Sequence, residues 1–336
     1  MITVDNTTIG IYDFNAAPYA LGDVATWIEN VAITAEESQS ISTEIFIITG
    51  PDQKYSAQSF INRENYHHHF GDLFPVFLFT PNLSKIHIYD GSHRLFGMVQ
   101  LFQLLKQRKN GNDIVHTWPS VNDTIRKKWV YSSHSRINSF YNKNRYIPRL
   151  SISPEFSGMY EYPITQIIND KTIISVNIRQ RKNYPDYRNT SGDTAHLLRD
   201  ASIQEWYDFF AYNEINNPDC LFLILGGYSE WDNKLFRFNN VIIPRTKGMN
   251  LYDEIALLLN SDMFCGSSSG FAQIATFSTV PYIITNMQPR AVNDALIPFG
   301  SPRYPFALDN QYLFWEREKT DQLINQFERV LKSIRT

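Results

Sequence analysis

The chain has 336 residues, more than one compact core usually holds, so two domains are expected. Hydrophobic residues make up 43% and charged residues 19%, as in an ordinary globular protein, and a net charge of −3 does not indicate a general nucleic-acid or membrane-surface binder. Two cysteines, both in apolar surroundings, exclude a disulfide framework.

The amino terminus, MITVDNTTIGIYDF, has neither a basic region nor a long apolar stretch, so no secretory signal peptide is expected. No apolar run approaches the roughly 18 residues that a membrane-spanning helix needs, so no transmembrane segment is expected either. We therefore expect a cytoplasmic protein. Peripheral association with the inner face of a membrane stays compatible with the sequence.

The first half alternates apolar strand patterns with helical ones. Residues 7–14 (TTIGIYDF) indicate a strand, followed by a glycine–aspartate loop, a helix over about 24–37 and a second strand that Gly50-Pro51 ends. A strand–helix–strand unit of this length predicts a parallel pair with a right-handed crossover. The rest of this half predicts strands at 74–81 and 84–90, a helix with a basic last turn at 94–111, and loops over 131–165.

The second half alternates more regularly. Short apolar strands are predicted at 172–178, 220–227, 239–244, 263–266 and 281–285. Helical patterns lie between or after them, at about 194–213, 250–261, 270–278 and 316–335. This alternation is typical of an open, doubly wound parallel sheet.

Three serines and a glycine stand between a predicted strand and a predicted helix. The turn consists of Ser267, Ser268, Ser269 and Gly270. It follows the end of a predicted strand at 264–266 (FCG) and precedes the helix. Ligands of open parallel sheets bind beyond the carboxyl ends of the strands, and helix N-termini favour anions. The turn therefore predicts a phosphate or diphosphate site, and the alternative is that the serines only cap the helix.

Arginines follow a different strand of the same predicted sheet. Arg179 comes directly after strand 172–178, and Arg188 lies in the loop beyond it. Guanidinium groups bind phosphate oxygens in bidentate fashion, so Arg179 is predicted to contact the anion. Gly227 ends another strand and permits a nucleotide to approach, or forms a simple turn. Glu254 is a candidate for a ribose hydroxyl, or a favourable acid in the first turn of a helix.

The segment 172–286 resembles the nucleotide-sugar-binding domain of GT-B glycosyltransferases, closest to bacterial surface-polysaccharide enzymes with a heptosyltransferase- or fucosyltransferase-like donor domain. The resemblance rests on VNIRQ, YPDYRNTSGD, LFLILGG and LYDEIALLLNSDMFCGSSSGFAQIATFSTVPYIITN. It implies that Arg179 and Ser268–Gly270 contact the donor diphosphate and that Asn286 lies near the site. Asn177 stands where the fucosyltransferase pattern has histidine, which disfavours a fucosyl donor.

The segment YDFNAAPYALGDVATWIENV resembles the opening strand, loop and helix of GT-B proteins. In heptosyltransferase-like relatives an aspartate of this loop is the proposed base, and the resemblance assigns that role to Asp23. The alternative is that Asp23 is only the N-cap of the helix from Val24 onward. The middle of the chain, 50–165, matches no pattern of the family.

A bound metal and an organic cofactor are not expected. The chain has no Asp-x-Asp triplet, and GT-B proteins usually hold the diphosphate without a metal. The run of histidines at 67–69 cannot turn three adjacent side chains toward one ion. One of them, or His93, remains a candidate for the acceptor side, although a polar loop position is the simpler interpretation of His93.

The run GSSSG at 266–270 also matches the Gly-x-Ser-x-Gly pattern of hydrolases. The acid and histidine of that triad should follow in the chain, and no histidine comes after His196. The sequence thus predicts a two-domain α/β protein of the GT-B class, with Rossmann-like domains at 1–160 and 161–336 facing across a cleft.

The predicted function is transfer of a sugar from a nucleotide-sugar donor to a cell-surface polysaccharide or related glycan. The alternatives are another sugar-modifying enzyme of this fold, such as a nucleotide-sugar hydrolase or pyruvyl transferase, and a nucleotide- or sugar-binding module without catalysis.

Overall fold

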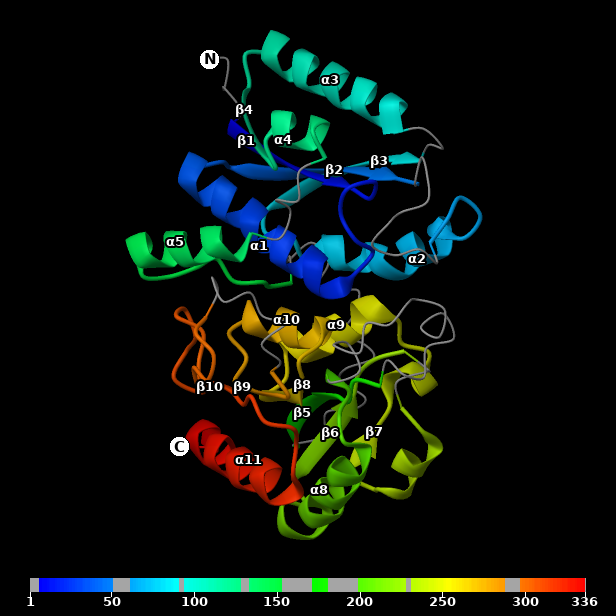
Figure 1. The fold of residues 1–336 in the computed structure, drawn as a ribbon, viewed down its shortest axis with the longest axis vertical. Coiled ribbons are helices and arrows are strands. Elements are labelled where there is room, and N and C mark those ends of the chain that lie inside the picture. Colours follow the sequence, from blue (N-terminus) through cyan, green and yellow to red (C-terminus); the bar gives the residue numbers. More distant parts are fainter. Residues whose placement is uncertain are drawn as a thin grey trace. The chain divides into compact units, whose positions relative to one another are not determined.

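The computed structural model describes residues 6–50, 61–90, 94–127, 133–152, 171–180, 199–227, 231–287 and 297–335. The chain divides into two compact units, Met1–Ser153 and Pro154–Thr336, each with its own parallel sheet (Figure 1). The boundary predicted at 160/161 lies outside the described residues.

The sheet of the first unit has four parallel strands in the order β3-β2-β1-β4. The strands are β1 (Asn6–Asp13), β2 (Ser42–Thr49), β3 (Leu83–Asp90) and β4 (Ile114–Trp118). Strands β1 and β2 are buried almost throughout, as expected of central parallel strands covered on both faces. From β1 the chain moves to β2 and β3 on one side and then returns to β4 on the other, so the strand order reverses at β1.

Helices cover both faces of this sheet. They are α1 (Leu21–Ser38), α2 (Tyr66–Leu73), the 3-10 helix η1 (Phe74–Phe79), α3 (Arg94–Asn110), α4 (Val121–Ile125) and α5 (His134–Asn144). Helices α1 and α3 lie on opposite sides of the sheet (Figure 1). Helix α1 packs closely because β1 has a glycine beneath it: a Cβ at Gly10 would lie 2.8 Å from Trp27 and 2.8 Å from Val31.

Two predictions for the first unit are wrong. Residues 74–81 were expected to form a strand, but most of them form η1, with Pro75 in its first turn and the buried Phe77 ring 5.3 Å from Tyr12 and 5.5 Å from Trp27. A short apolar run cannot by itself distinguish a strand from a buried helical turn. The predicted loop over 131–165 contains α5, which buries only Ile137 and Phe140 and is otherwise polar.

The sheet of the second unit has six parallel strands in the order β10-β9-β8-β5-β6-β7. The strands are β5 (Thr172–Asn177), β6 (Cys220–Ile224), β7 (Val241–Ile242), β8 (Met263–Ser267), β9 (Tyr282–Thr285) and β10 (Gln311–Leu313). Counted along the chain from β5, this is the 3-2-1-4-5-6 order of doubly wound sheets. The order reverses between β5 and β8, which is the switch point at which such sheets bind ligands.

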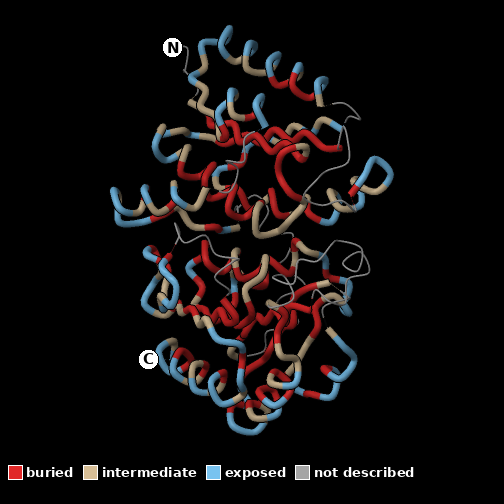
Figure 2. Tube along the Cα trace, viewed as in Figure 1, coloured by how far each residue is buried: buried red, intermediate tan, exposed pale blue. Residues whose placement is uncertain are grey.

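Helices flank the second sheet as well. They are α8 (Ile203–Asn216), η5 (Asn233–Arg237), η6 (Pro244–Lys247), α9 (Leu251–Leu259), α10 (Gly270–Thr276) and α11 (Thr320–Arg335). Helices α8 and α11 share one apolar core with the sheet, built around Phe209, Phe222 and Phe327. Helices α9 and α10 lie on the other side (Figure 1). Strands β1 and β2 of the first sheet and β5, β6, β8 and β9 of the second are buried, whereas β3 and β4 are largely half-buried or exposed. The outer faces of the helices are exposed (Figure 2).

Candidate functional site

The carboxyl edge of the second sheet brings together residues that are far apart in the sequence. The pairing of Asn177 with Gly266, and of Ser267 with Thr285, places the ends of β5, β8 and β9 side by side. The Arg179 backbone N–H donates to the Ser267 hydroxyl at 3.3 Å across the switch point. The arginine and the serine turn, predicted separately, therefore lie at one site.

Gly266 permits this close approach of β5 and β8. A Cβ at Gly266 would lie 2.7 Å from the carbonyl oxygen of Asn177, a contact that real structures avoid. Any other residue at this position would push the two strands apart at the switch point. The glycine of the GSSSG run therefore serves strand pairing in the sheet.

Arg179 is anchored inside the second unit. Its side chain is 7% exposed, and Nη1 donates to Oδ1 of Asp200 at 2.8 Å. The Arg179 carbonyl also accepts from the N–H of Ala201 at 2.9 Å. These contacts tie the segment before α8 to the end of β5 and orient the guanidinium at the edge. Its contact with a diphosphate stays a prediction.

The three serines of the turn have different roles. Ser267 is fully buried, and its hydroxyl accepts the Arg179 N–H. Ser269 is the N-cap of α10, and its Oγ accepts from the Ala272 N–H at 3.2 Å. The capping interpretation therefore holds for Ser269. The Ser268 hydroxyl is half-buried and makes no hydrogen bond within the described part of the chain.

Backbone groups of the turn are available beside Ser268. The Ser268 N–H is already hydrogen-bonded, because it donates to the carbonyl oxygen of Thr285 at 2.9 Å. The N–H groups of Gly270 and Phe271 begin α10 and donate to no acceptor among the described residues. One hydroxyl and two amide donors are thus gathered at the switch point, a set that suits an oxyanion.

Arg199 and Asp200 were not predicted from the sequence. Arg199 Nη2 donates to the carbonyl oxygen of Ser268 at 2.9 Å, so it holds the serine turn from outside. Asp200 accepts from Arg179, and its carbonyl oxygen accepts from Nδ2 of Asn286 at 3.2 Å. No motif marks these two residues, which precede α8 and come to the edge only through tertiary packing.

Asn286 follows β9 and lies in the same network. It is fully buried and has a left-handed backbone with φ of 54°, which asparagine tolerates better than most residues. Its side-chain hydrogen bond to the Asp200 carbonyl oxygen places it at the carboxyl edge, and its proximity to a bound donor stays a prediction. Arg188 lies outside the described residues.

Glu254 supports the edge from within α9. It is fully buried: Oε1 accepts from the Gly226 N–H at 3.0 Å and Oε2 from Arg245 Nη2 at 2.8 Å. Burial raises the pKa of this carboxyl, and the Arg245 guanidinium opposes the shift. Both oxygens are engaged inside the unit, while the predicted ribose contact stays a prediction. Gly227 follows Gly226 at the end of β6 and is half-buried.

In the first unit, Asp23 lies in the first turn of α1. The helix begins at Leu21 with Ala20 as its N-cap, so the interpretation of Asp23 as the N-cap is wrong. The half-buried carboxylate complements the helix dipole from the third helical position. Because α1 directly follows β1, this turn lies on the carboxyl side of the first sheet. The role of Asp23 as a base stays a prediction.

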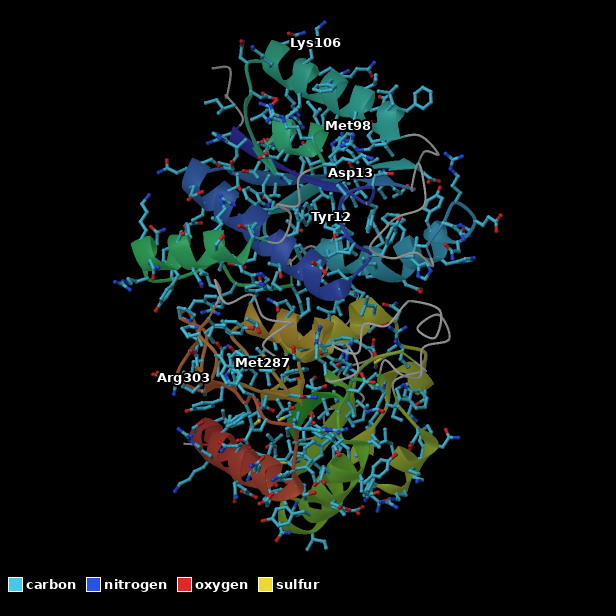
Figure 3. The ribbon with its side chains drawn as sticks, viewed as in Figure 1. Tyr12, Asp13, Met98, Lys106, Met287 and Arg303 are labelled. Atoms are coloured by element: carbon cyan, nitrogen blue, oxygen red, sulfur yellow. The ribbon has the colours of Figure 1, made fainter. Side chains whose placement is uncertain are left out.

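The carboxyl edge of the first sheet carries an acidic and phenolic cluster. Asp13, at the end of β1 (Figure 3), is buried and accepts from Arg94 and from the Asn15 N–H. Asp90 ends β3, and its Oδ1 accepts from Thr49 at 2.9 Å and from the Tyr66 hydroxyl at 2.5 Å. The hydrogen bond to Asp90 raises the pKa of Tyr66 to about 12.

The histidine run forms part of α2. His67 and His68 are exposed and His69 is half-buried, and successive side chains on a helix point about 100° apart. Among the described residues, no group of three or more His, Cys, Asp and Glu side chains could hold a metal ion. His93 lies outside the described residues. No helix in the described ranges is both long and apolar enough to cross a bilayer.

Sequence comparisons identify no relative: no protein-family model matches the chain, and no curated protein matches it. Solved structures share its fold, among them two glycosyltransferases. A glycosyl transferase of family 9 from Veillonella parvula DSM 2008 superposes with a TM-score of 0.53 at 11% identity, over 99% of this chain and 99% of that one. The ADP-heptose lipopolysaccharide heptosyltransferase II of E. coli superposes with a TM-score of 0.57 at 8% identity, over 98% of this chain and 100% of that one.

At such identities the likeness concerns the fold. Both solved structures have a GT-B-type fold, and the likeness covers nearly the whole chain. Together with the two parallel sheets, this confirms the predicted α/β fold of the GT-B type, with two Rossmann-like units.

Proposed function

We propose that this chain is a glycosyltransferase that moves a sugar from a nucleotide-sugar donor to a cell-surface polysaccharide or related glycan, without a bound metal. The observation that supports it best is the switch point of the second sheet. There the Ser268 hydroxyl and the first amides of α10 have no acceptor within the described residues, next to the Arg179 and Arg199 side chains.

The reaction requires that charge be stabilised as the donor breaks. The acceptor oxygen forms a bond to the sugar C1, while the bond from C1 to the diphosphate oxygen breaks and leaves its electron pair on the diphosphate. Hydrogen-bond donors that already point at the developing charge lower this barrier most. In the proposal, Ser268, the Gly270 amide and the guanidinium of Arg179 supply that stabilisation, and Arg188 and Asn286 complete the donor side.

The acceptor hydroxyl must lose its proton in the same reaction. In the proposal, the Asp23 carboxylate takes it, since a carboxylate can act as a general base. We further propose that the chain works in the cytoplasm, in peripheral contact with the inner face of a membrane, where a surface glycan is assembled.

Two alternatives predict different outcomes. A nucleotide- or sugar-binding module of the same fold would bind the donor without turnover. Another sugar-modifying enzyme, such as a nucleotide-sugar hydrolase or pyruvyl transferase, would turn over in the absence of a glycan acceptor or with a different co-substrate. Assays of donor loss with and without acceptor therefore separate the three.

The first experiment is thermal unfolding in the presence of ADP, GDP, UDP, dTDP and CMP. ADP heads the panel because one structure of the same fold is described as an ADP-heptose heptosyltransferase. A nucleotide that binds only the folded chain raises its stability by about 2.7 kcal/mol at a hundred times its dissociation constant. We expect one nucleotide to shift the transition clearly. No shift with any of the five, on folded protein, would remove the support for a donor site.

A further inference from the structure

Helix α3 exposes apolar side chains on the face that turns away from the sheet. Leu95 is 72% exposed, Val99 42% and Phe102 45%, whereas Met98 and Leu101 pack against the sheet. The exposed three are four and three residues apart, so they lie along one face of the helix. Soluble surfaces usually scatter such side chains singly, and an ordered row of them marks an interaction site.

Two lysines continue the same row. Lys106 and Lys109 follow Phe102 by four and seven residues, which keeps them on the face of Leu95, Val99 and Phe102. Figure 3 shows Lys106 on the outer side of α3 and Met98 on the side of the sheet. We call the row Leu95, Val99, Phe102, Lys106 and Lys109 the α3 stripe. It extends over about 21 Å of helix.

The charge of this face is entirely positive along the helix. Helix α3 contains four basic residues and no Asp or Glu. Arg94 pairs with Asp13, and Arg108 pairs with Glu44 and Asp113, so these two are neutralised. Lys106 and Lys109 are exposed and form no ion pair within the ranges that the structure describes. In a chain of net charge −3, this local excess of cations is a distinct feature.

The end of α4 extends the surface. Arg94 Nη2 donates to the carbonyl oxygen of Thr124, so the start of α3 meets the end of α4. Next to Thr124, Ile125 is 45% exposed, and Arg126 and Lys127 are exposed. An apolar residue with cations beside it therefore adjoins the apolar end of the α3 stripe.

We propose that the α3 stripe docks the chain on a membrane surface rich in anionic phospholipids, with α3 parallel to the bilayer plane. The apolar side chains would enter the boundary between headgroups and acyl chains, and the lysine stems would extend their ammonium groups to the phosphates. Basic residues near an anionic surface add attraction that falls with ionic strength. The proposal rests on the membrane association in the proposed function, and it does not depend on the transfer reaction.

A second copy of this chain fits the stripe less well. A two-fold interface sets the same patch against itself, and the stripe has no acid that could pair with its lysines. Three apolar side chains in a row also fall well short of the roughly 800 Å² per partner that a stable interface buries. An anionic bilayer surface complements both parts of the stripe, because its headgroups attract the lysines and its acyl boundary takes up the apolar side chains.

The test is cosedimentation of the full chain with large vesicles. One set is phosphatidylcholine alone, and the other contains about a third phosphatidylglycerol. We expect binding to the anionic vesicles that weakens with added salt. Leu95→Ser/Phe102→Ser and Lys106→Glu/Lys109→Glu should each lower the partition coefficient roughly tenfold or more. The control substitutions Ile215→Ser and Lys143→Glu change an equally exposed isoleucine and lysine elsewhere, and should leave binding unchanged.

The outcomes are distinct because vesicle binding needs no donor or acceptor. Unchanged circular dichroism and thermal unfolding would confirm that the variants fold. No binding to anionic vesicles by the folded wild type, or equal loss in the control variants, would overturn the proposal and leave the transfer reaction untouched. Concentration-dependent dimers that the stripe variants abolish, without vesicle binding, would assign the face to a second copy.

Discussion

The carboxyl edges of the two sheets have the same topology and different chemistry. In both sheets the chain builds three strands to one side and returns to the other, so each has a switch point beside its first strand. At the first edge lie the carboxylates of Asp13, which pairs with Arg94, and of Asp90, which accepts from the phenol of Tyr66. At the second lie Arg179, which pairs with Asp200, and Arg199 beside the serine turn.

This difference shows how one fold supports two roles. Strand order decides where an edge lies, whereas the residues after each strand decide its charge. An edge with guanidinium and amide donors suits a diphosphate, and an edge with carboxylates and a phenol suits hydroxyl groups and proton transfer. Single substitutions at either edge test whether the two edges have these different roles.

The largest expected effect is on turnover at the first edge. Asp23→Asn should lower the transfer rate by about 10²–10⁴-fold, because a neutral amide cannot take the acceptor proton. Nucleotide affinity, measured by thermal shift, should not change. Asp72→Asn on α2 is the matched control, an exposed acid of the same unit. Unaltered transfer by Asp23→Asn would show that the base is another residue.

Arg179→Ala should destabilise the second unit by about 3–5 kcal/mol, because it removes a buried ion-pair partner of the Asp200 carboxylate. Urea unfolding measures the change. The matched control is Arg335→Ala, whose ion pair with Asp219 is solvent-exposed and should contribute less than about 1 kcal/mol. Equal effects for the two variants would mean that Arg179 does not anchor the edge.

The serine turn allows binding to be separated from capping. Ser268→Ala should weaken nucleotide binding by roughly tenfold, since a hydrogen bond to a charged group contributes about 1.5–3 kcal/mol. Its effect on stability should be small, because the hydroxyl has no partner within the described residues. Ser269→Ala should instead lower stability by about 1 kcal/mol through loss of the N-cap. Titration calorimetry and thermal unfolding distinguish the two, and the reverse result would contradict the assignment.

The smallest effect concerns a buried acid in each unit. Glu29 on α1 is fully buried, and neither of its oxygens has a hydrogen-bond partner within the described part of the chain. Burial raises the pKa of Glu29 well above the ordinary carboxyl value of 4.5, and the charge of Arg149 opposes this shift only partly. At a pH between the unfolded-state and the folded-state pKa of Glu29, the folded state holds a proton that the unfolded state has lost. The free energy of unfolding therefore falls as the pH rises above 4.5.

Glu29→Gln removes that titration and should stabilise the chain by roughly 1 kcal/mol at neutral pH. The gain should vanish near pH 4. Glu254→Gln is the contrast, because the carboxylate there binds Gly226 and Arg245 and its loss should destabilise. Chemical unfolding at several pH values checks both. A gain for Glu29→Gln that does not depend on pH would exclude titration as its cause.

Prediction from the sequence succeeded where one local signal was sufficient. The segment 172–178 is rich in β-branched residues and directly precedes Arg179, so both the strand and the residue at its end were predicted. It failed at η1, because the run from Phe74 to Phe79 is apolar in either conformation. It failed again at α5, where two buried residues among eleven give little periodicity.

The candidate site divides in the same way. Ser267–Gly270 and Asn286 have a local pattern that predicts the edge of a sheet. Arg199 and Asp200 have none, although Asp200 bonds both Arg179 and Asn286. Their positions depend on how the segment before α8 packs against the ends of β5 and β9. These two strands flank β8 in the sheet but are far apart in the sequence.

The sequence by itself determined the alternation of strands and helices in the second unit, the apolar cores and the serine turn after β8, because hydrophobic period and turn residues act over a few positions. The tertiary structure decided which strand ends meet, which serine has a free hydroxyl in the described chain, and which buried acids have partners. Those outcomes depend on contacts between residues 21 to 88 positions apart, and local preference carries no information about them.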